Sequence, residues 1–197
     1  MKLLQFGITL IILAVFIAPI PAESAPTGTL VVDVQEYTSQ VKIKKKVAKQ
    51  LKHGGVVWGL SDHLLIVSLV NKQYVKPKLS NMTRYGEQNE LGLEAGEYKI
   101  TCIGFLHKKT SGDVDKVLSK SAFFNEEVMT FTILPDKTTT LEIVPVIKKQ
   151  KAFLTNMFAP EYTVRVIEDG IEKAEAIISQ RTGLSVAWDD YSGPLKF

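Results

Sequence analysis

The chain has little of what a disulfide-stabilised, metal-binding or catalytic protein needs. Its 197 residues include one cysteine and three histidines. A single cysteine, Cys102, excludes an intramolecular disulfide, so an apolar core must hold the fold together. The histidines are not paired with other ligand types at the short spacings of zinc sites, and no Gly-x-Ser-x-Gly nucleophile elbow occurs. We therefore expect no enzymatic activity, no cofactor and no metal.

Two local features resemble catalytic chemistry, and each has a simpler structural explanation. Ser61-Asp62-His63 has the residue types of a hydrolase triad, but consecutive residues of an extended chain point to alternating sides. A turn between two strands is the better interpretation. Cys102 shares a predicted strand face with Tyr98 and Ile100, and a buried cysteine behaves as a small hydrophobe. Neither feature indicates a nucleophile.

The start of the chain is almost without charge. Lys2 is the only charged side chain in residues 1–22, and an apolar run over residues 10–20 follows it. Pro21 and the small Ala22 come next, an order typical of a secretory signal peptide. We expect residues 1–22 to be a signal peptide that is cleaved after Ala22. The alternative is an uncleaved membrane anchor, because the apolar stretch approaches the ~18 residues that can span a bilayer.

Export restricts the partners more than charge does. The formal net charge of +3 is too small to specify a partner, but an exported chain does not meet cytoplasmic nucleic acid. The missing disulfide fits a bacterial envelope protein better than an animal secreted one. We expect the mature protein in the bacterial periplasm, or tethered to the membrane if the N-terminal segment is retained.

Beyond this segment, apolar and polar residues alternate with β-strand spacing. The alternating or strongly apolar segments are residues 29–37, 56–60, 64–70, 97–105, 128–134 and 138–147. They predict an all-β fold, an antiparallel β-sandwich of Ig-like or transthyretin-like type over residues 27–147. The turn formers Pro135-Asp136-Lys137 lie between the last two segments and predict a β-hairpin there.

The segment 39–53 fits two structures. Val41, Ile43 and Val47 alternate with lysines as in a strand, whereas Ile43, Val47 and Leu51 also have helical spacing and Gly54 follows them. We expect a strand in the first half of the segment and leave the second half open.

The composition changes after Ile147. Residues 148–151 contain three lysines, and two or three strand-like segments follow before the C-terminus. We expect residues 148–197 to form a linker and a small C-terminal β appendage. Such a piece is too small for a core of its own, so it should dock on the sandwich or pair with another chain.

Two central segments resemble a known class of domain. Leu93-Glu94-Ala95-Gly96-Glu97-Tyr98-Lys99-Ile100 and the later stretch from Phe131 to Ile143 look like PEGA-type and transthyretin-like envelope domains. In those domains a Gly-x-Tyr opens a core strand and a later hairpin closes the sheet. The PEGA tetrapeptide itself is absent. The resemblance implies a small sandwich used as a structural or binding module, by analogy only, because such folds host many functions.

The first candidate binding surface is a run of lysines. It comprises Lys42, Lys44, Lys45, Lys46, Lys49 and Lys52. In a strand or a helix several of them share a solvent face, and such a patch can meet anionic lipid, polysaccharide or an acidic protein, at roughly 1 kcal/mol per lysine against a charged membrane. The alternative is an edge strand that lysines protect against aggregation. Lys42, Lys44, Lys46 and Lys49 are the candidate binding residues.

The second candidate is an aromatic and acidic cluster near the C-terminus. Trp188, Asp190 and Tyr191 can stack on a sugar ring and bond its hydroxyls, or anchor a protein interface. The alternative is packing, in which Trp188 ends a strand and covers the core while Tyr191 caps it.

These observations predict a non-catalytic binding or structural module of the cell envelope, with a protein partner as the first expectation. One alternative is a glycan- or lipid-binding accessory protein that uses the lysine patch. Another is an unrecognised hydrolase or metalloenzyme. The sequence does not indicate the oligomeric state.

Overall fold

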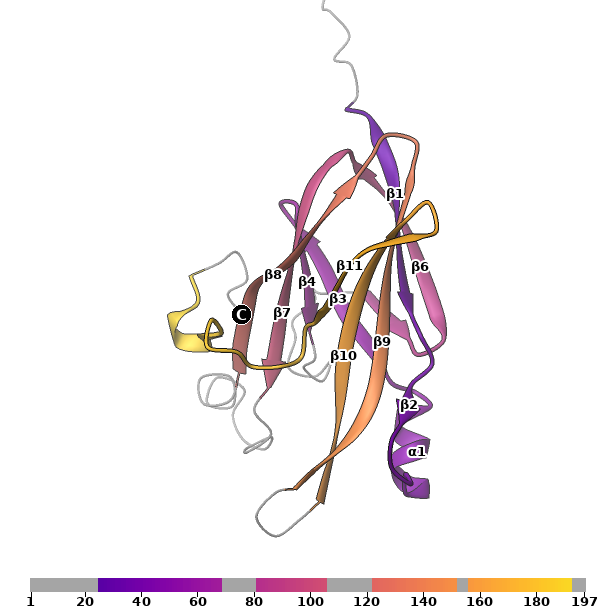
Figure 1. Ribbon diagram of the computed structural model, residues 1–197, viewed down its shortest axis with the longest axis vertical. Helices are drawn as coiled ribbons and strands as arrows, with labels where there is room; N and C mark the ends of the chain where they lie inside the picture. The colour runs from indigo at the N-terminus through magenta and orange to yellow at the C-terminus, as the bar shows by residue number, and fades with distance from the viewer. Residues whose placement is uncertain (1–24, 69–80, 106–121, 152–155, 193–197) are drawn as a thin grey trace, which may run out of the picture.

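The structure, a computed structural model, describes residues 25–68, 81–105, 122–151 and 156–192 (Figure 1). The signal peptide expected at residues 1–22 lies outside these ranges. Two β-sheets pack against each other, and one short α-helix, α1 (Lys45–Leu51), lies at one end of them. The prediction of an all-β sandwich is confirmed.

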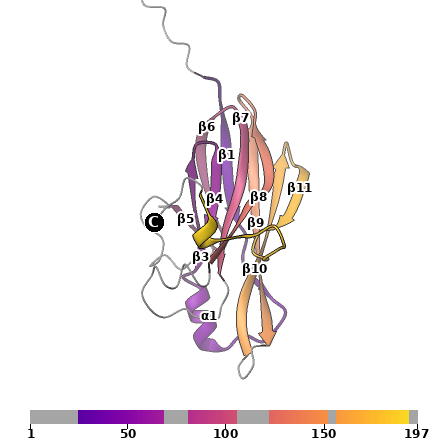
Figure 2. The same cartoon turned by 90° about the vertical axis from the view of Figure 1, so that its left-hand side faces the viewer.

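Each sheet contains six strands in the described part of the chain. Sheet A has the order β11-β10-β9-β1-β6, and β2 pairs with β9. Its strands are β1 (Thr27–Val34), β2 (Thr38–Ser39), β6 (Glu87–Glu94), β9 (Thr138–Lys151), β10 (Asn156–Glu168) and β11 (Ile171–Ile177). Sheet B has the order β12-β8-β7-β4-β3-β5. Its strands are β3 (Gly55–Ser61), β4 (Leu64–Ser68), β5 (Asn81–Arg84), β7 (Gly96–Phe105), β8 (Ala122–Ile133) and β12 (Val186–Ala187). Figure 2 shows the two layers from the side.

The main core lies between the sheets and is built from alternate residues of the strands. Leu30, Val32 and Val34 of β1 face Trp58 and Ile100 of sheet B in one buried cluster. Burying each large apolar side chain contributes about 1.5–3 kcal/mol. This cluster replaces the disulfides that the chain lacks.

Sheet B also buries part of its outer face. Val57, Ile66, Ile103 and Phe124 form a second cluster with Tyr191 of the C-terminal segment. That segment contains β12, which pairs with β8, and a short 3-10 helix, η2 (Trp188–Asp190). Because both faces are covered, the β3 and β4 sequences are continuous apolar runs instead of alternating ones.

Strand directions differ in part from the prediction of an antiparallel sandwich. Among the described residues, seven of the ten strand pairings are antiparallel, but β1–β9, β2–β9 and β4–β7 are parallel. Alternation along a strand shows which face is buried and does not show the direction of the neighbouring strand.

The predicted hairpin around Asp136 is wrong. β8 belongs to sheet B and β9 to sheet A, so residues 134–137 carry the chain from one sheet to the other. The turn is held by β1, because the Asp136 N–H donates to the Thr27 carbonyl at 2.9 Å and the Thr29 N–H donates to the Lys137 carbonyl at 2.8 Å. Turn formers between two strands indicate a reversal of the chain, and they do not indicate whether the strands then pair.

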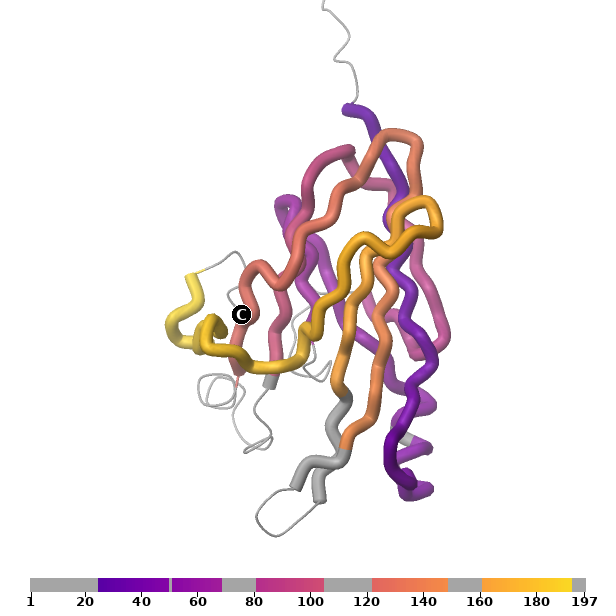
Figure 3. The backbone as a smooth tube through the Cα atoms, in the orientation of Figure 1, coloured from indigo at the N-terminus to yellow at the C-terminus, as the bar shows by residue number. Residues whose placement is uncertain are grey.

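The linker predicted after residue 147 falls inside β9, which continues to Lys151. β10 pairs with β9 along its whole length, and β11 pairs with β10. Tyr162, Val164 and Val166 of β10 are buried in the main core. The region expected as a C-terminal appendage therefore supplies two strands of sheet A and the cover of sheet B. Figure 3 shows residues 161–177 running alongside the rest of sheet A.

The second half of the segment 39–53, which the sequence left open, forms the helix α1 from Lys45 to Leu51. The strand expected in the first half is wrong, because β2 ends at Ser39 and the residues between it and α1 form no strand. Val47 and Leu51 are half-buried, one helical turn apart, which explains the helical spacing. In the described ranges no helix is long and apolar enough to cross a membrane.

Two strand glycines differ in the space around them. A Cβ on Gly55 of β3 would lie 2.2 Å from the Thr83 carbonyl oxygen, whereas one on Gly92 of β6 would meet nothing within 4 Å. We expect Gly55→Ala to lower the free energy of unfolding by about 1–3 kcal/mol, because β5 must move. Gly92→Ala should leave stability unchanged or higher, since glycine weakens a strand. Urea denaturation compares the two, and equal losses would contradict the close approach of β3 and β5.

Candidate functional site

Six lysines lie on α1 and directly before and after it, and we call them the lysine surface. They are Lys42, Lys44, Lys45, Lys46, Lys49 and Lys52, and all are exposed. None forms an ion pair with a described residue, and the first turn of α1 contains no acidic residue. The four lysines that the sequence singled out, Lys42, Lys44, Lys46 and Lys49, are thus brought together with their charge uncompensated.

Backbone contacts fix this segment at one end of the sandwich. β2 pairs with β9, and the Gln40 N–H donates to the Ile147 carbonyl at 3.3 Å. At the other side of α1, the Gly54 N–H donates to the Leu51 carbonyl at 2.8 Å and ends the helix. The lysine surface therefore lies at the end of the molecule opposite the start of β1 (Figure 1).

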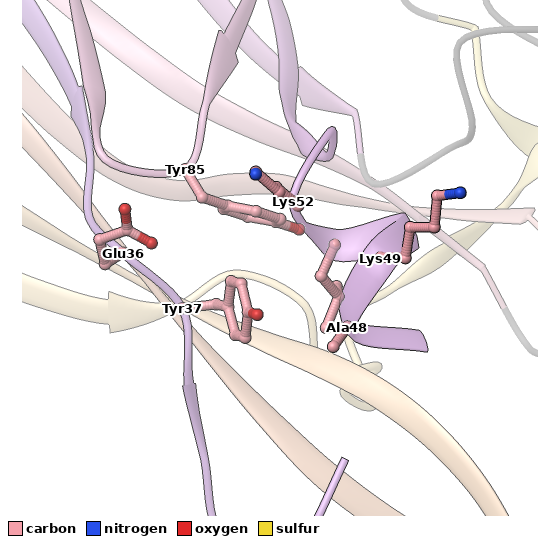
Figure 4. A pocket seen from close by; sticks show the side chains of 7 residues that line it. Glu36, Tyr37, Ala48, Lys49, Lys52 and Tyr85 are labelled. Carbon is pink, nitrogen blue, oxygen red and sulfur yellow. The ribbon is translucent and has the colours of Figure 1, made fainter. Parts of the chain in front are cut away.

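A pocket of about 470 Å³ opens beside the lysine surface (Figure 4). It is lined by Glu36, Tyr37, Ala48, Lys49, Leu51, Lys52 and Tyr85. These residues come from the chain after β1, from α1 and its C-terminal end, and from the turn between β5 and β6. The volume is in the range of small-ligand sites. The Tyr37 and Tyr85 rings meet edge to face, with centroids 5.7 Å apart and an interplanar angle of 69°, an arrangement that aromatic pairs favour.

Tyr85 forms a fixed wall of the pocket. Its hydroxyl hydrogen-bonds the Tyr162 hydroxyl at 2.8 Å. A Cβ at Gly54 would lie 2.8 Å from its ring, so glycine there permits the close approach of the ring to the chain after α1. Burial raises the pKa of both Tyr85 and Tyr162. Both phenols therefore stay neutral at ordinary pH, and the hydroxyl pair is kept.

Glu36 brings a carboxylate into a pocket whose other charges are positive. Gly86 has φ +79°, and a Cβ there would lie 2.6 Å from a carboxylate oxygen of Glu36. Among the described residues, Glu36 forms no ion pair, with the pocket lysines or with any other cation. The pocket thus offers the Glu36 carboxylate as an acceptor and the Lys52 ammonium group as a donor, while the Lys49 ammonium group points away from it (Figure 4).

The C-terminal candidates are placed elsewhere and are used for packing. Tyr191 is 8% exposed and stacks on Phe124, with ring centroids 3.6 Å apart. Trp188 stacks on the same ring at 5.1 Å, while Asp190 is exposed. Figure 1 shows this segment on the side of the molecule away from α1, so the two predicted surfaces do not form one site.

The residues considered for chemistry have structural roles. Cys102 is fully buried, and burial raises the pKa of its thiol well above the usual range, which keeps it unreactive. Asp62 and His63 have positive φ angles of 46° and 61°, which fits the predicted turn between β3 and β4. Among the described residues, no three acidic, histidine or cysteine side chains are grouped so that they could hold a metal ion.

Sequence reasoning missed Glu36, Tyr37 and Tyr85. Tyr37 and Tyr85 lie far apart in the sequence, and neither belongs to a motif that would indicate a binding site. One signal could have indicated Tyr37, which follows a predicted strand and lies five residues before Lys42. Tyr85 is distant from the lysines in the sequence and carries no such signal. Their convergence depends on the β1–β6 pairing, which sets Val34 opposite Glu87.

No protein-family model, curated protein or solved structure matches the chain. The resemblance to PEGA-type and transthyretin-like domains is neither supported nor contradicted by this result and stays a prediction.

Proposed function

We propose that the protein is an exported, non-catalytic binding module that holds an anionic partner of the cell envelope on its lysine surface. The observation that carries the proposal is the set of six exposed lysines without an ion pair to any described residue. Elsewhere on the surface, cations such as Lys99 and Arg165 are paired with carboxylates. An unpaired cluster raises the local concentration of anions and speeds their association.

The position of the surface favours a macromolecule of the envelope over the lipid next to the N-terminus. β1 runs from Thr27 at one end of the sandwich towards the end where α1 lies (Figure 1), and its eight residues span roughly 25 Å. If the N-terminal segment is retained in a membrane, the lysine surface points away from that membrane. Screening limits attraction between exposed charges to about 8–10 Å at physiological salt, so the surface acts on partners at the far end.

A pair of charge reversals with a matched control tests the proposal. We expect Lys44→Glu with Lys46→Glu to weaken binding to an anionic polymer by about tenfold or more, since each lysine contributes on the order of 1 kcal/mol at low salt. The control, Lys137→Glu with Lys173→Glu, changes the net charge equally at exposed positions outside the lysine surface and should bind as the wild type does.

Immobilised oligogalacturonate and oligoglutamate serve as the anionic probes, measured at low and at near-molar salt. The wild type should bind at low salt and lose binding as salt rises. Absence of wild-type binding to both probes, or an equal loss in the two variants, would count against the lysine surface as the binding surface.

A further inference from the structure

We infer that the pocket lined by Tyr37, Tyr85 and α1 is a subsite for one sugar ring of an acidic polysaccharide, a uronate-type residue with both hydroxyls and a carboxylate. This inference rests on the proposed function, because Lys49 and Lys52 belong to the lysine surface and also line the pocket. The lysines alone do not specify which class of anion binds, and the lining of the pocket indicates that class.

The charges of the pocket select among anionic ligands. Lys49 and Lys52 lie three residues apart, on α1 and just after it. The Lys52 ammonium group lies on the Tyr85 side of the pocket, whereas that of Lys49 points away from it (Figure 4). Lys52 can therefore offer its ammonium group to a carboxylate. Glu36 lines the same pocket and only accepts hydrogen bonds when ionised. A ligand that satisfies both side chains carries a hydroxyl donor for Glu36 and an anion for Lys52. A uronate ring has both, whereas the ionised side chain of an acidic peptide and a phosphate chain offer Glu36 no donor.

The apolar part of the lining suits the carbon face of a sugar. Ala48 and Leu51 of α1 and the rings of Tyr37 and Tyr85 contribute it. Aromatic side chains provide a large apolar surface with a polar tip, and they lose little conformational entropy when they bind. A sugar ring presents C–H groups on its faces and hydroxyls around its edge, so it can contact a tyrosine ring and Glu36 at the same time.

The aromatic wall of the pocket is preorganised. The Tyr85 hydroxyl is bonded to Tyr162 at 2.8 Å, and the Tyr85 ring contacts Tyr37 edge to face. These two rings need little ordering when a ligand binds, which reduces the entropic cost of binding. Tyr37 is half-buried and has no hydrogen bond through its hydroxyl to a described residue, so it is the ring that can be altered with least effect on the fold.

Binding of three probes of equal length tests the inference: oligogalacturonate, a neutral oligogalactan and oligoglutamate. We expect the wild type to prefer oligogalacturonate. Tyr37→Ala should weaken that binding about tenfold and leave oligoglutamate within a factor of about two, since its lysines are intact. Tyr37→Phe keeps the ring and should bind as the wild type does. A thermal melt of each variant controls for folding.

The outcomes separate the pocket from the lysine surface. Loss of oligogalacturonate binding in Tyr37→Ala, with retention in Tyr37→Phe, supports a sugar subsite. Equal wild-type binding of oligogalacturonate and oligoglutamate, unchanged in Tyr37→Ala, overturns the subsite and leaves the proposed function intact; it would favour an acidic protein partner. If the wild type binds neither anionic probe, the proposed function fails and the subsite fails with it.

Discussion

Alanine in place of Phe124 is expected to lower the free energy of unfolding by about 3–5 kcal/mol, as for other large buried aromatics. Phe124 is fully buried on the outer face of sheet B. Its ring stacks on Tyr191 at 3.6 Å and on Trp188 at 5.1 Å. The substitution therefore removes a core side chain and also the aromatic contacts of the C-terminal segment with β8, while the β12–β8 pairing remains. Urea denaturation followed by circular dichroism measures the loss.

A second measurement distinguishes the release of this segment from general destabilisation. Backbone amides of residues 186–191 should exchange with deuterium faster in Phe124→Ala under native conditions, because local opening becomes easier once the stacking is lost. Asp190→Ala is the matched control in the same segment. Asp190 is exposed, so its removal should change stability by less than about 0.5 kcal/mol. A stability loss below about 1 kcal/mol in Phe124→Ala, with unchanged exchange, would show that the segment does not depend on this ring.

The sequence predicted the buried strand faces well. Tyr98, Ile100 and Cys102 were expected on one face of a strand, and all three are buried in the main core. The same holds for Leu30, Val32 and Val34, in part because a strand with one solvated face must alternate. Alternation is a local property, so a local pattern is sufficient to predict it.

Strand pairing was not predicted, because it is not local. The reversal at Asp136 was found, but β8 and β9 enter opposite sheets. Both strands alternate in the same way whether they pair with each other or face each other across the core. Whether the two strands pair or enter different sheets depends on which strand forms the backbone hydrogen bonds of the turn. Here that strand is β1, through Thr27 and Thr29.

The C-terminal region was underestimated for a related reason. The lysines from Lys148 onward suggested a linker, yet β9 runs through them and β10 continues its pairing beyond the core. A long strand leaves the core at its ends, where polar residues are expected in place of apolar ones. A change in composition therefore marked the edge of the core and not the edge of a domain.

The candidate site was half predicted. The lysine surface follows from the sequence, because several of six lysines in one short segment share a solvent face in a strand or in a helix. The pocket does not follow from it. Tyr37 and Tyr85 meet only because β1 and β6 pair and because glycines at positions 54 and 86 leave room for neighbouring side chains. Both depend on tertiary structure, which a motif within one segment of the sequence cannot indicate.

The corner where β5 of sheet B leads into β6 of sheet A depends on Trp58. The Trp58 indole N–H donates to the Thr83 hydroxyl at 2.9 Å, and the Asn89 side-chain amide donates to the same oxygen at 2.9 Å. Trp58 and Thr83 are each 1% exposed. This bond network joins three strands, β3, β5 and β6, and it lies close to the turn that carries Tyr85. Its loss should therefore affect both the core and the pocket.

We expect Trp58→Ala to lower the free energy of unfolding by about 3–5 kcal/mol through cavity formation, and the Tm by on the order of 10 °C. Trp58→Phe should cost less, about 1–2 kcal/mol, because it keeps most of the buried ring and the Thr83 hydroxyl still accepts from Asn89. Calorimetry and urea denaturation give both values.

Thr83→Val separates the hydrogen bonds from the volume. Valine has nearly the same shape, but it leaves the Trp58 indole and the Asn89 amide without their acceptor, at about 1–3 kcal/mol. Combined with Trp58→Phe, the loss should be smaller than the sum of the two single losses, since one donor has already gone. Strict additivity would mean that the indole N–H does not depend on Thr83. The stability of the corner would then come from the packing of Trp58 alone.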